Sequence, residues 1–185
     1  MYINWSKPVS GPDGVPIPTY GNYGGPGYSN GEILSSPNQS VDYSATPVDA
    51  LDSLFRAHDM VYDSPSTLVR AEGDLALIMG IEHLSQTPMS GEESLYAGAA
   101  LIFAVEQLTV TNGHPELLSA RQLAAAATTS EHDIAYGLTH LDPSDVAGGA
   151  GLLAHSAESI TADVLSHEAF PSFVSGLMSP LHNSI

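Results

Sequence analysis

The stretch that decides the fold reads TPVDALDSLFRAHDMVYD, from Thr46 to Asp63. It carries several signals for the start of a helix. Thr46 can cap a helix, Pro47 suits the first helical position, and Asp49 favours the positive end of the helix dipole. The sequence therefore predicts a helix from Pro47 to Tyr62.

One face of this predicted helix is apolar except for two groups. Spacings of four, three and four residues place Leu51, Phe55, His58 and Tyr62 on that face. Asp59 follows His58, about 100° further round the helix axis. An isolated pair of this kind is also typical of a core histidine beside a solvated aspartate. The segment upstream of the helix is therefore needed to distinguish a functional site from ordinary core packing.

That segment is YGNYGGPGY, from Tyr20 to Tyr28, with four glycines in nine residues. Such a run favours a loop over a helix or a strand, and it lets backbone carbonyls turn towards a common centre. Calcium binds oxygen ligands of this kind and needs carboxylate charge to complete its shell. The loop and a helix aspartate together indicate a calcium site, while a flexible, tyrosine-rich surface loop is the alternative.

Together, the two stretches resemble the secreted phospholipase A2 family. That family has a glycine-rich calcium loop of the form Y-G-x-Y-x-G-x-G, matched here by Tyr20, Gly21, Tyr23, Gly25 and Gly27. Its helix has the form D-x-C-C-x-x-H-D-x-C-Y, matched by Asp52, His58, Asp59 and Tyr62, with Leu54, Phe55 and Val61 at the places of cysteines.

The resemblance covers about a third of the chain, from Tyr20 to Leu84, and departs from the family in two ways. The chain has no cysteine, whereas the animal enzymes are rich in disulfides. The gap between loop and helix is also longer than usual, with Ser29 to Ala45 inserted. We therefore expect a divergent, cysteine-free, bacterial-like member.

Asp74 is the third residue of the predicted site. It precedes an apolar stretch, from Leu75 to Met79, where an unpaired carboxylate is costly. In the family, a second aspartate on an antiparallel helix holds the catalytic histidine. Gly73-Asp74-Leu75-Ala76-Leu77 resembles that pattern. For Asp74 to lie at the height of His58, its helix should begin near Thr67 rather than at Pro65.

The resemblance implies calcium-dependent hydrolysis of the sn-2 ester of glycerophospholipids, which would make the protein a carboxylic ester hydrolase. His58 would be the general base on a water, Asp74 would fix its tautomer, and Tyr62 would hydrogen-bond Asp74. Calcium would be held by the carbonyls of Tyr23, Gly25 and Gly27 and by the Asp59 carboxylate. The Gly25 amide would stabilise the developing oxyanion.

Three alternatives remain open at this stage. The stretch from His132 to Tyr136 repeats the His-Asp-x-x-Tyr pattern without a glycine loop before it. The two His-Asp pairs of this chain also suggest the helical phosphohydrolases with an H…HD…D signature, but these need transition-metal ligands and do not explain the glycine loop. A non-catalytic module stabilised by calcium is the third possibility. Calcium dependence separates the phospholipase from the phosphohydrolase, and turnover separates it from the module.

The composition of the chain restricts its partners. With 185 residues and 43% hydrophobic content, we expect one globular domain over residues 1–185. The chain has four basic and 21 acidic residues and a net charge of −17. This charge argues against binding to nucleic acids and against attraction to anionic membranes. We find no transmembrane stretch and no signal peptide pattern, and we expect a secreted or extracellular protein in a cation-rich setting.

We predict a mainly α fold: a helical bundle with two antiparallel catalytic helices, a glycine-rich calcium loop and an irregular N-terminal wrap over residues 1–45, anchored by Trp5. Residues 20–84 would form the phospholipase A2-like core, and residues 85–185 would add helices of unknown role. The expected helices are Thr67 to Leu84, a capping-box helix from Ser90 to Val110, an Ala-rich helix from His114 to Leu141 broken near Thr128 to Ser130, and one from Asp142 to Ala169.

The substrate partner would be phospholipid at a membrane or micelle interface. Because the chain is so acidic, contact with lipid would have to be apolar. Candidate docking residues are Tyr20, Tyr28, Ile33 and Leu34 beside the loop, and the segments from Phe170 to Phe173 and from Gly176 to Met178. The alternative for these residues is ordinary core packing.

Overall fold

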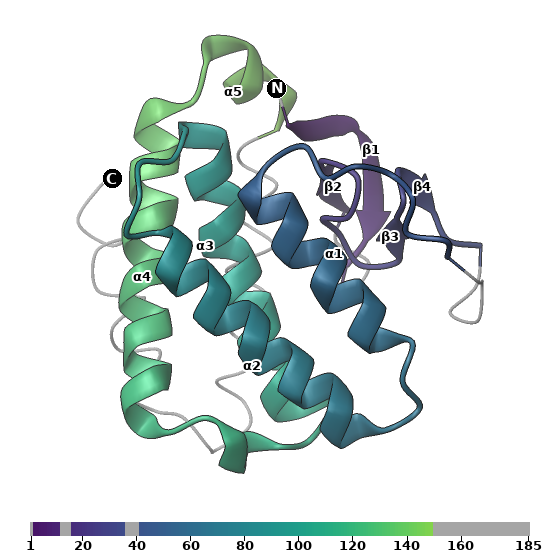
Figure 1. Cartoon of the computed structure of the whole chain (residues 1–185). Helices are drawn as coiled ribbons and strands as arrows, with labels where there is room; N and C mark the ends of the chain where they lie inside the picture. The colour runs from purple at the N-terminus through teal and green to yellow at the C-terminus, as the bar shows by residue number, and fades with distance from the viewer. Residues whose placement is uncertain (1, 12–15, 36–40, 150–185) are drawn as a thin grey trace.

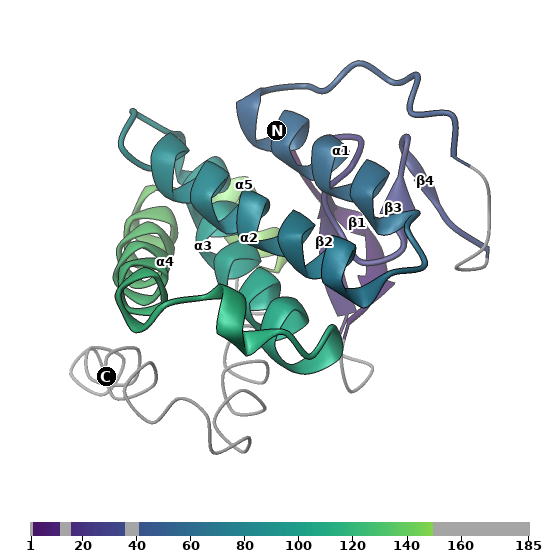
Figure 2. The same ribbon diagram turned by 60° about the horizontal axis from the view of Figure 1, so that its bottom comes forward.

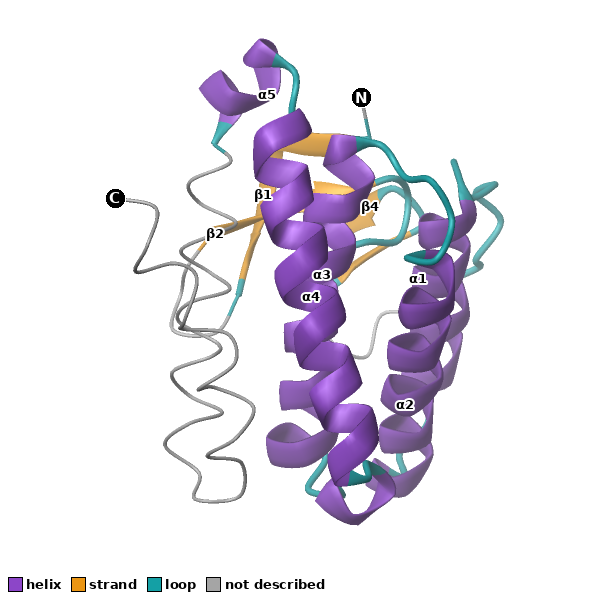
Figure 3. Ribbon diagram, turned by 90° about the vertical axis from the view of Figure 1, so that its left-hand side faces the viewer, coloured by secondary structure: helices purple, strands orange, loops and turns teal. Residues whose placement is uncertain are grey.

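The computed structural model describes residues 2–11, 16–35 and 41–149, and this part of the chain is mainly helical, as predicted (Figure 1). Its helices are α1 (Ala50–Tyr62), α2 (Thr67–Leu84), α3 (Gly91–Glu106), α4 (Ala120–His140) and α5 (Pro143–Gly148). Its strands are β1 (Ile3–Ser10), β2 (Pro16–Tyr20), β3 (Tyr28–Ser29) and β4 (Glu32–Ile33). The helices pack together, and the strands lie at one side of them in Figure 1 and behind α3 and α4 in the view of Figure 3.

The prediction of an irregular N-terminal wrap is wrong where that region forms the four strands. β1 pairs with β2 in an antiparallel hairpin that faces Ile3 with Tyr20 and Val9 with Ile17, and β3 pairs with β4. The prolines that suggested irregular structure are tolerated because every strand of a two-stranded sheet is an edge. The hairpin buries these apolar residues against the protein, which local composition did not indicate.

α1 ends at Tyr62 as predicted but begins three residues later than expected. Asp49, rather than Thr46, is the N-cap, and its carboxylate accepts a hydrogen bond from the Asp52 amide. The Val48 amide also donates to Asp52, at 2.9 Å, which holds the residues before α1 outside the helix. A capping aspartate at this position replaces the expected proline start.

α2 has the predicted bounds, and its N-cap is Ser66. The short turn over residues 63–66 returns the chain so that α1 and α2 lie side by side (Figure 2). The sequence predicts that the face of α2 with Leu68, Ala71, Leu75, Ile78 and Met79 points to the core, and this prediction is only partly right. Ala71 and Ile78 are buried, but Leu68 and Met79 are 43% and 53% exposed.

α3 begins with the predicted capping box of Ser90 and Glu93 and continues into one π-helical turn, Gln107–Thr111. The stretch Gly91–Thr111 is long and apolar enough to cross a membrane, with a mean hydropathy of 1.3. About two thirds of its most apolar window, 67%, is buried inside the protein. A central core helix of a soluble protein has the same properties.

α4 corrects a further prediction, because it is unbroken where a break was expected. It begins at Ala120 behind a capping box of Ser119 and Gln122, and Pro115–Leu117 forms only a short 3-10 turn. The Ser130 hydroxyl donates to the Gly98 carbonyl of α3 at 2.7 Å, so this polar residue stabilises the helix packing. α5 ends at Gly148, and Gly149 follows it as a C-cap with a positive φ of 126°, so the predicted helix does not continue through Gly149. The remaining part of the predicted helix, to Ala169, lies outside the described residues.

Candidate functional site

The centre of the candidate site is a contact between α1 and α2. His58 Nε2 lies 2.8 Å from Asp74 Oδ1, and the Asp74 carboxyl is fully buried. The Tyr62 hydroxyl donates to the same Asp74 oxygen at 2.7 Å. The structure therefore brings together three residues that the sequence predicted, from two helices.

This geometry determines which nitrogen of His58 can accept a proton. A carboxylate only accepts hydrogen bonds, so the nitrogen facing Asp74 carries the hydrogen of the neutral ring. His58 Nδ1 then has a free lone pair, and it lies 4.0 Å from Asp59 Oδ1. Burial and the adjacent Asp74 carboxylate raise the pKa of Tyr62 far above its ordinary range, so its hydroxyl stays a donor.

A fourth residue of this cluster, Asn112, was not predicted. Its side-chain amide donates to Asp74 Oδ2 at 2.8 Å and lies 2.9 Å from the Tyr62 hydroxyl. Arg70 Nε donates to the Asn112 carbonyl oxygen at 3.0 Å. The sequence signal at this point, Asn followed by Gly, indicates only the end of a helix.

The glycine-rich loop is attached to α1 through a buried carboxylate. Asp52 accepts hydrogen bonds from the backbone amides of Asn22 and Tyr23, at 3.0 Å and 2.9 Å. Gly21 has a positive φ of 53°, and a Cβ atom there would lie 2.4 Å from the Asp52 carboxyl carbon. Only glycine permits this close approach. Packing between the loop and α1 therefore explains why glycine stands at position 21 and aspartate at position 52.

The loop carbonyls proposed as ligands already take part in the local backbone structure. The Gly25 carbonyl accepts from the Tyr28 amide at 3.1 Å, and the Gly27 carbonyl accepts from the Leu34 amide at 2.8 Å. Each carbonyl oxygen has a second lone pair that can still bind a cation. Positive φ angles of 141° and 64° at these two glycines shape the loop.

Asp59 carries a buried carboxyl oxygen beside the glycine-rich loop. Its Oδ2 is buried and has no hydrogen-bond partner in the described part of the chain. Burial, with smaller effects from Asp52 and Asp63, raises the pKa of this carboxyl to about 8, against a weaker opposing effect of the Ser29 hydroxyl. Ser29 follows the glycine-rich loop directly. A cation bound here would satisfy the oxygen and offset the burial of its charge.

The described residues contain no group of three or more His, Asp or Glu side chains arranged around a common point. Such a group is typical of transition-metal centres. The ligands predicted from the sequence are of another kind, one carboxylate and three backbone carbonyls, and oxygen ligands of this kind are those that calcium takes in proteins.

The second His-Asp pair has a different environment. The His132 side chain is 72% exposed, and its Nδ1 lies 3.1 Å from its own neighbour Asp133. Asp133 is buried and accepts from the Ser85 hydroxyl. The His132 ring stacks on Tyr136 at the surface of α4.

The predicted docking residues are only partly at the surface. Tyr20 and Tyr28 are 0% and 5% exposed, so their prediction as lipid contacts is wrong, because both rings belong to the core. Ile33 is 49% exposed. The C-terminal docking segments, from Phe170 and from Gly176, lie outside the described residues.

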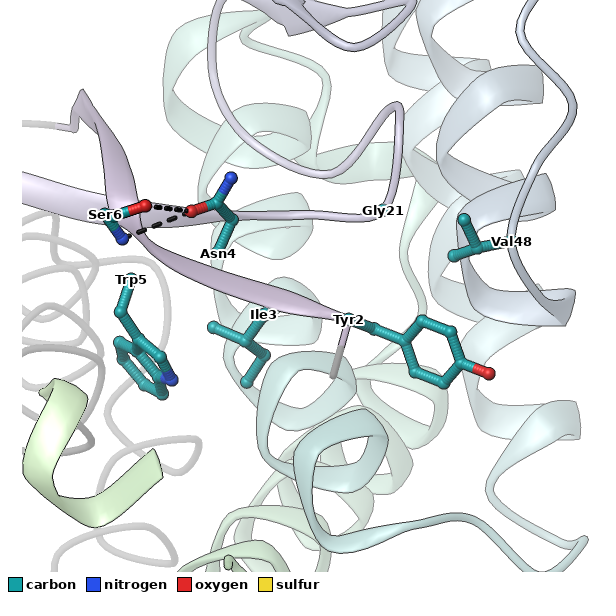
Figure 4. Close-up of a pocket in the computed structure, with 7 residues that line it drawn as sticks. All are labelled: Tyr2, Ile3, Asn4, Trp5, Ser6, Gly21 and Val48. Atoms are coloured by element: carbon teal, nitrogen blue, oxygen red, sulfur yellow. Dashed lines mark hydrogen bonds between the residues drawn. The ribbon is translucent and has the colours of Figure 1, made fainter. Parts of the chain in front are cut away.

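A cleft of about 390 Å³ opens beside the start of the glycine-rich loop (Figure 4). It is lined by Tyr2, Ile3, Asn4, Trp5, Ser6, Gly21 and Val48. None of these residues belongs to the cluster around Asp74.

Comparison of the chain with protein-family models, curated proteins and solved structures gives no match. The strongest observation is that His58, Asp74, Tyr62 and the orphaned Asp59 oxygen lie on two adjacent helices.

Proposed function

We propose that the protein is a calcium-dependent phospholipase A2-type esterase that cleaves the sn-2 ester of glycerophospholipids. The observation that carries the proposal is the His58–Asp74 contact of 2.8 Å beside a buried, unpartnered Asp59 oxygen. In this reading, α1 and α2 are the two antiparallel catalytic helices, and residues 20–84 form the catalytic core. The glycine-rich segment is the calcium loop.

His58 is the general base of the proposed reaction. Its Nδ1 removes a proton from a water molecule as the water oxygen attacks the ester carbonyl carbon. The Nε2–H remains hydrogen-bonded to Asp74, which holds the ring in the required tautomer and stabilises the imidazolium that forms. The imidazolium then returns the proton to the departing alkoxide of the lysophospholipid as the ester C–O bond breaks.

The carbonyls of Tyr23, Gly25 and Gly27 and the Asp59 carboxylate are the residues that would hold calcium. When bound there, the ion supplies positive charge that polarises the ester carbonyl and attracts the substrate phosphate. The Gly25 amide is the backbone donor that we assign to the developing oxyanion. The high pKa of Asp59 supports this assignment, since burying this carboxylate without a cation is unfavourable.

The decisive experiment measures fatty-acid release from mixed phospholipid micelles with calcium and then with an excess of chelator. We expect release with calcium and its loss with chelator. Release that needs a transition metal, or hydrolysis of phosphate esters in place of carboxylic esters, would contradict the proposal. A folded, calcium-binding protein that releases no fatty acid would identify a non-catalytic module.

The charge of the chain predicts a preference among lipid surfaces. At −17, the protein is repelled by an anionic bilayer, and an extracellular setting with abundant cations would weaken that repulsion. We expect initial rates on vesicles to fall as the anionic lipid fraction rises at low calcium, and to recover with added salt. Rates that climb with the anionic fraction would show that a local patch, rather than net charge, governs docking.

A further inference from the structure

The buried Asp74 carboxylate is contacted from a third part of the fold that the proposed mechanism does not use. Asn112 follows the π-helical turn Gln107–Thr111 at the end of α3 and is only 5% exposed. Its backbone amide donates to the Gln107 carbonyl at 2.7 Å, which closes the wide turn. Turns of this type are frequent at functional sites because the extra residue redirects the side chains that follow.

The contacts of Asn112 form a closed ring around Asp74. One side-chain amide group faces Asp74 Oδ2 at 2.8 Å and the Tyr62 hydroxyl oxygen at 2.9 Å, so its two hydrogens are both used. The Tyr62 hydroxyl in turn donates to Asp74 Oδ1 at 2.7 Å. Both carboxylate oxygens are therefore held, and the plane of the carboxylate is defined.

The orientation of the Asn112 amide is determined by its other end. Arg70 Nε can only donate, and it donates to Asn112 Oδ1 at 3.0 Å, which turns the amide nitrogen towards Asp74. A second nitrogen of Arg70 donates to the Ser64 carbonyl at 2.9 Å, so the guanidinium is itself fixed. A chain of oriented hydrogen bonds thus runs from Arg70 through Asn112 and Asp74 to His58.

We propose that Asn112 is a positioning residue of the catalytic site, which holds the Asp74 carboxylate in the orientation that presents Oδ1 to His58 Nε2. Its effect on turnover rests on the proposed function, but its effect on the His58 ring does not. Without Asn112, Asp74 Oδ2 would lose the one hydrogen-bond donor that it has in the described part of the chain, and the carboxylate could rotate away from the imidazole. A buried carboxylate with an unmet oxygen is also unfavourable.

The test compares Asn112→Ala and the isosteric Asn112→Asp with Ser130→Ala. The control removes a buried hydrogen bond between α4 and the Gly98 carbonyl, a loss of similar kind in another part of the fold. For Asn112→Ala we expect kcat to fall about tenfold, and for Asn112→Asp more, because a second carboxylate would face Asp74. KM and calcium affinity should stay at wild-type values in all three variants.

A second readout needs no turnover. NMR of ¹⁵N-histidine-labelled protein reports which imidazole nitrogen carries the hydrogen. The spectra are recorded in the presence of calcium, at a pH at which the imidazole is neutral. We expect a single Nε2–H form of His58 in the wild type and in Ser130→Ala, and mixed forms in both Asn112 variants. If only one Asn112 variant folds, that variant suffices.

Two outcomes overturn the inference: unchanged His58 signals in the Asn112 variants, or a kcat loss no larger than that of Ser130→Ala. A wild type without lipid hydrolysis would contradict the proposed function alone, since the NMR comparison would still decide the role of Asn112.

Discussion

The chain contains the pattern His-Asp-x-x-Tyr twice, and the two copies differ in which residue faces the interior. At residues 58–62, the histidine turns inwards, with its side chain 14% exposed and hydrogen-bonded to Asp74 of α2. At residues 132–136, the aspartate turns inwards to Ser85, and the histidine is 72% exposed. The motif therefore does not specify a site, because the face of the helix that is buried decides which side chain can react.

The tyrosines show the same contrast. Tyr62 donates its hydroxyl to the carboxylate that holds His58. Tyr136 instead lies at the surface, where its ring stacks on that of His140 with centroids 3.9 Å apart. In the first copy, α2 and the end of α3 supply hydrogen-bond partners to the histidine and the tyrosine of the motif. In the second copy, the contacts of the histidine ring come from its own helix.

The largest expected effect comes from exchanging each histidine. His58→Gln should lower ester hydrolysis by about 10²–10⁴-fold, the usual contribution of a general base, with little loss of fold. His132→Gln should keep wild-type activity, because its ring is mostly exposed. Initial rates on mixed micelles measure both variants. An inactive His132→Gln beside an active His58→Gln would reverse the assignment of the two copies.

Exchanging the two aspartates should separate calcium binding from stability. Asp59→Asn should lose most calcium affinity, because it removes the only side-chain carboxylate proposed for the ion. Calcium should then no longer raise the melting temperature. Asp133→Asn should bind calcium normally but be destabilised by about 1–3 kcal/mol, through its buried contact with Ser85. Calorimetric titration and thermal melts test both, and equal calcium binding by wild type and Asp59→Asn would place the ion elsewhere.

The pKa of Asp59 predicts how the stability of the calcium-free protein changes with pH. Its value rises from 3.8 to about 8 on folding, so between these limits the unfolded chain releases a proton that the folded protein keeps. Stability should therefore fall as pH rises from about 4 to 8, by at most about 1.4 kcal/mol per pH unit from this group. Asp59→Asn should flatten this slope. Urea unfolding at several pH values with chelator measures it, and an unchanged slope would show that Asp59 ionises normally.

The smallest effect is expected from the tyrosine hydroxyls. Tyr62→Phe removes one of the hydrogen bonds to Asp74 and should reduce kcat by about tenfold or less. Tyr136→Phe should change neither kcat nor stability, because stacking is kept and the hydroxyl is not part of the motif's contacts. Steady-state kinetics on both variants distinguish these results. Equal losses in the two variants would mean that the hydroxyl of Tyr62 has no specific role.

Local signals allowed a large part of the candidate site to be predicted. Helical periodicity placed His58 and Tyr62 on one face. The start of α2 was predicted at Thr67 because Asp74 then lies level with His58 along the helix axes, and α2 does begin at Thr67. The glycines of the loop were recognised because their conformations are open to few other residues. These inferences depend on neighbours within a few positions along the chain, where sequence spacing and spatial distance agree.

The sequence by itself thus determined the helix α2, the capping box of α3, the interruption at the glycine-rich loop and the candidate residues on α1 and α2. Only the tertiary structure decided that the N-terminal region pairs into hairpins, that Tyr20 and Tyr28 are core residues, and that α4 is continuous. It also decided which His-Asp copy faces inwards and that Asn112 holds Asp74 from a distance of 38 positions along the chain. Burial and side-chain partnership depend on which surfaces meet when the chain folds, and local spacing does not encode this.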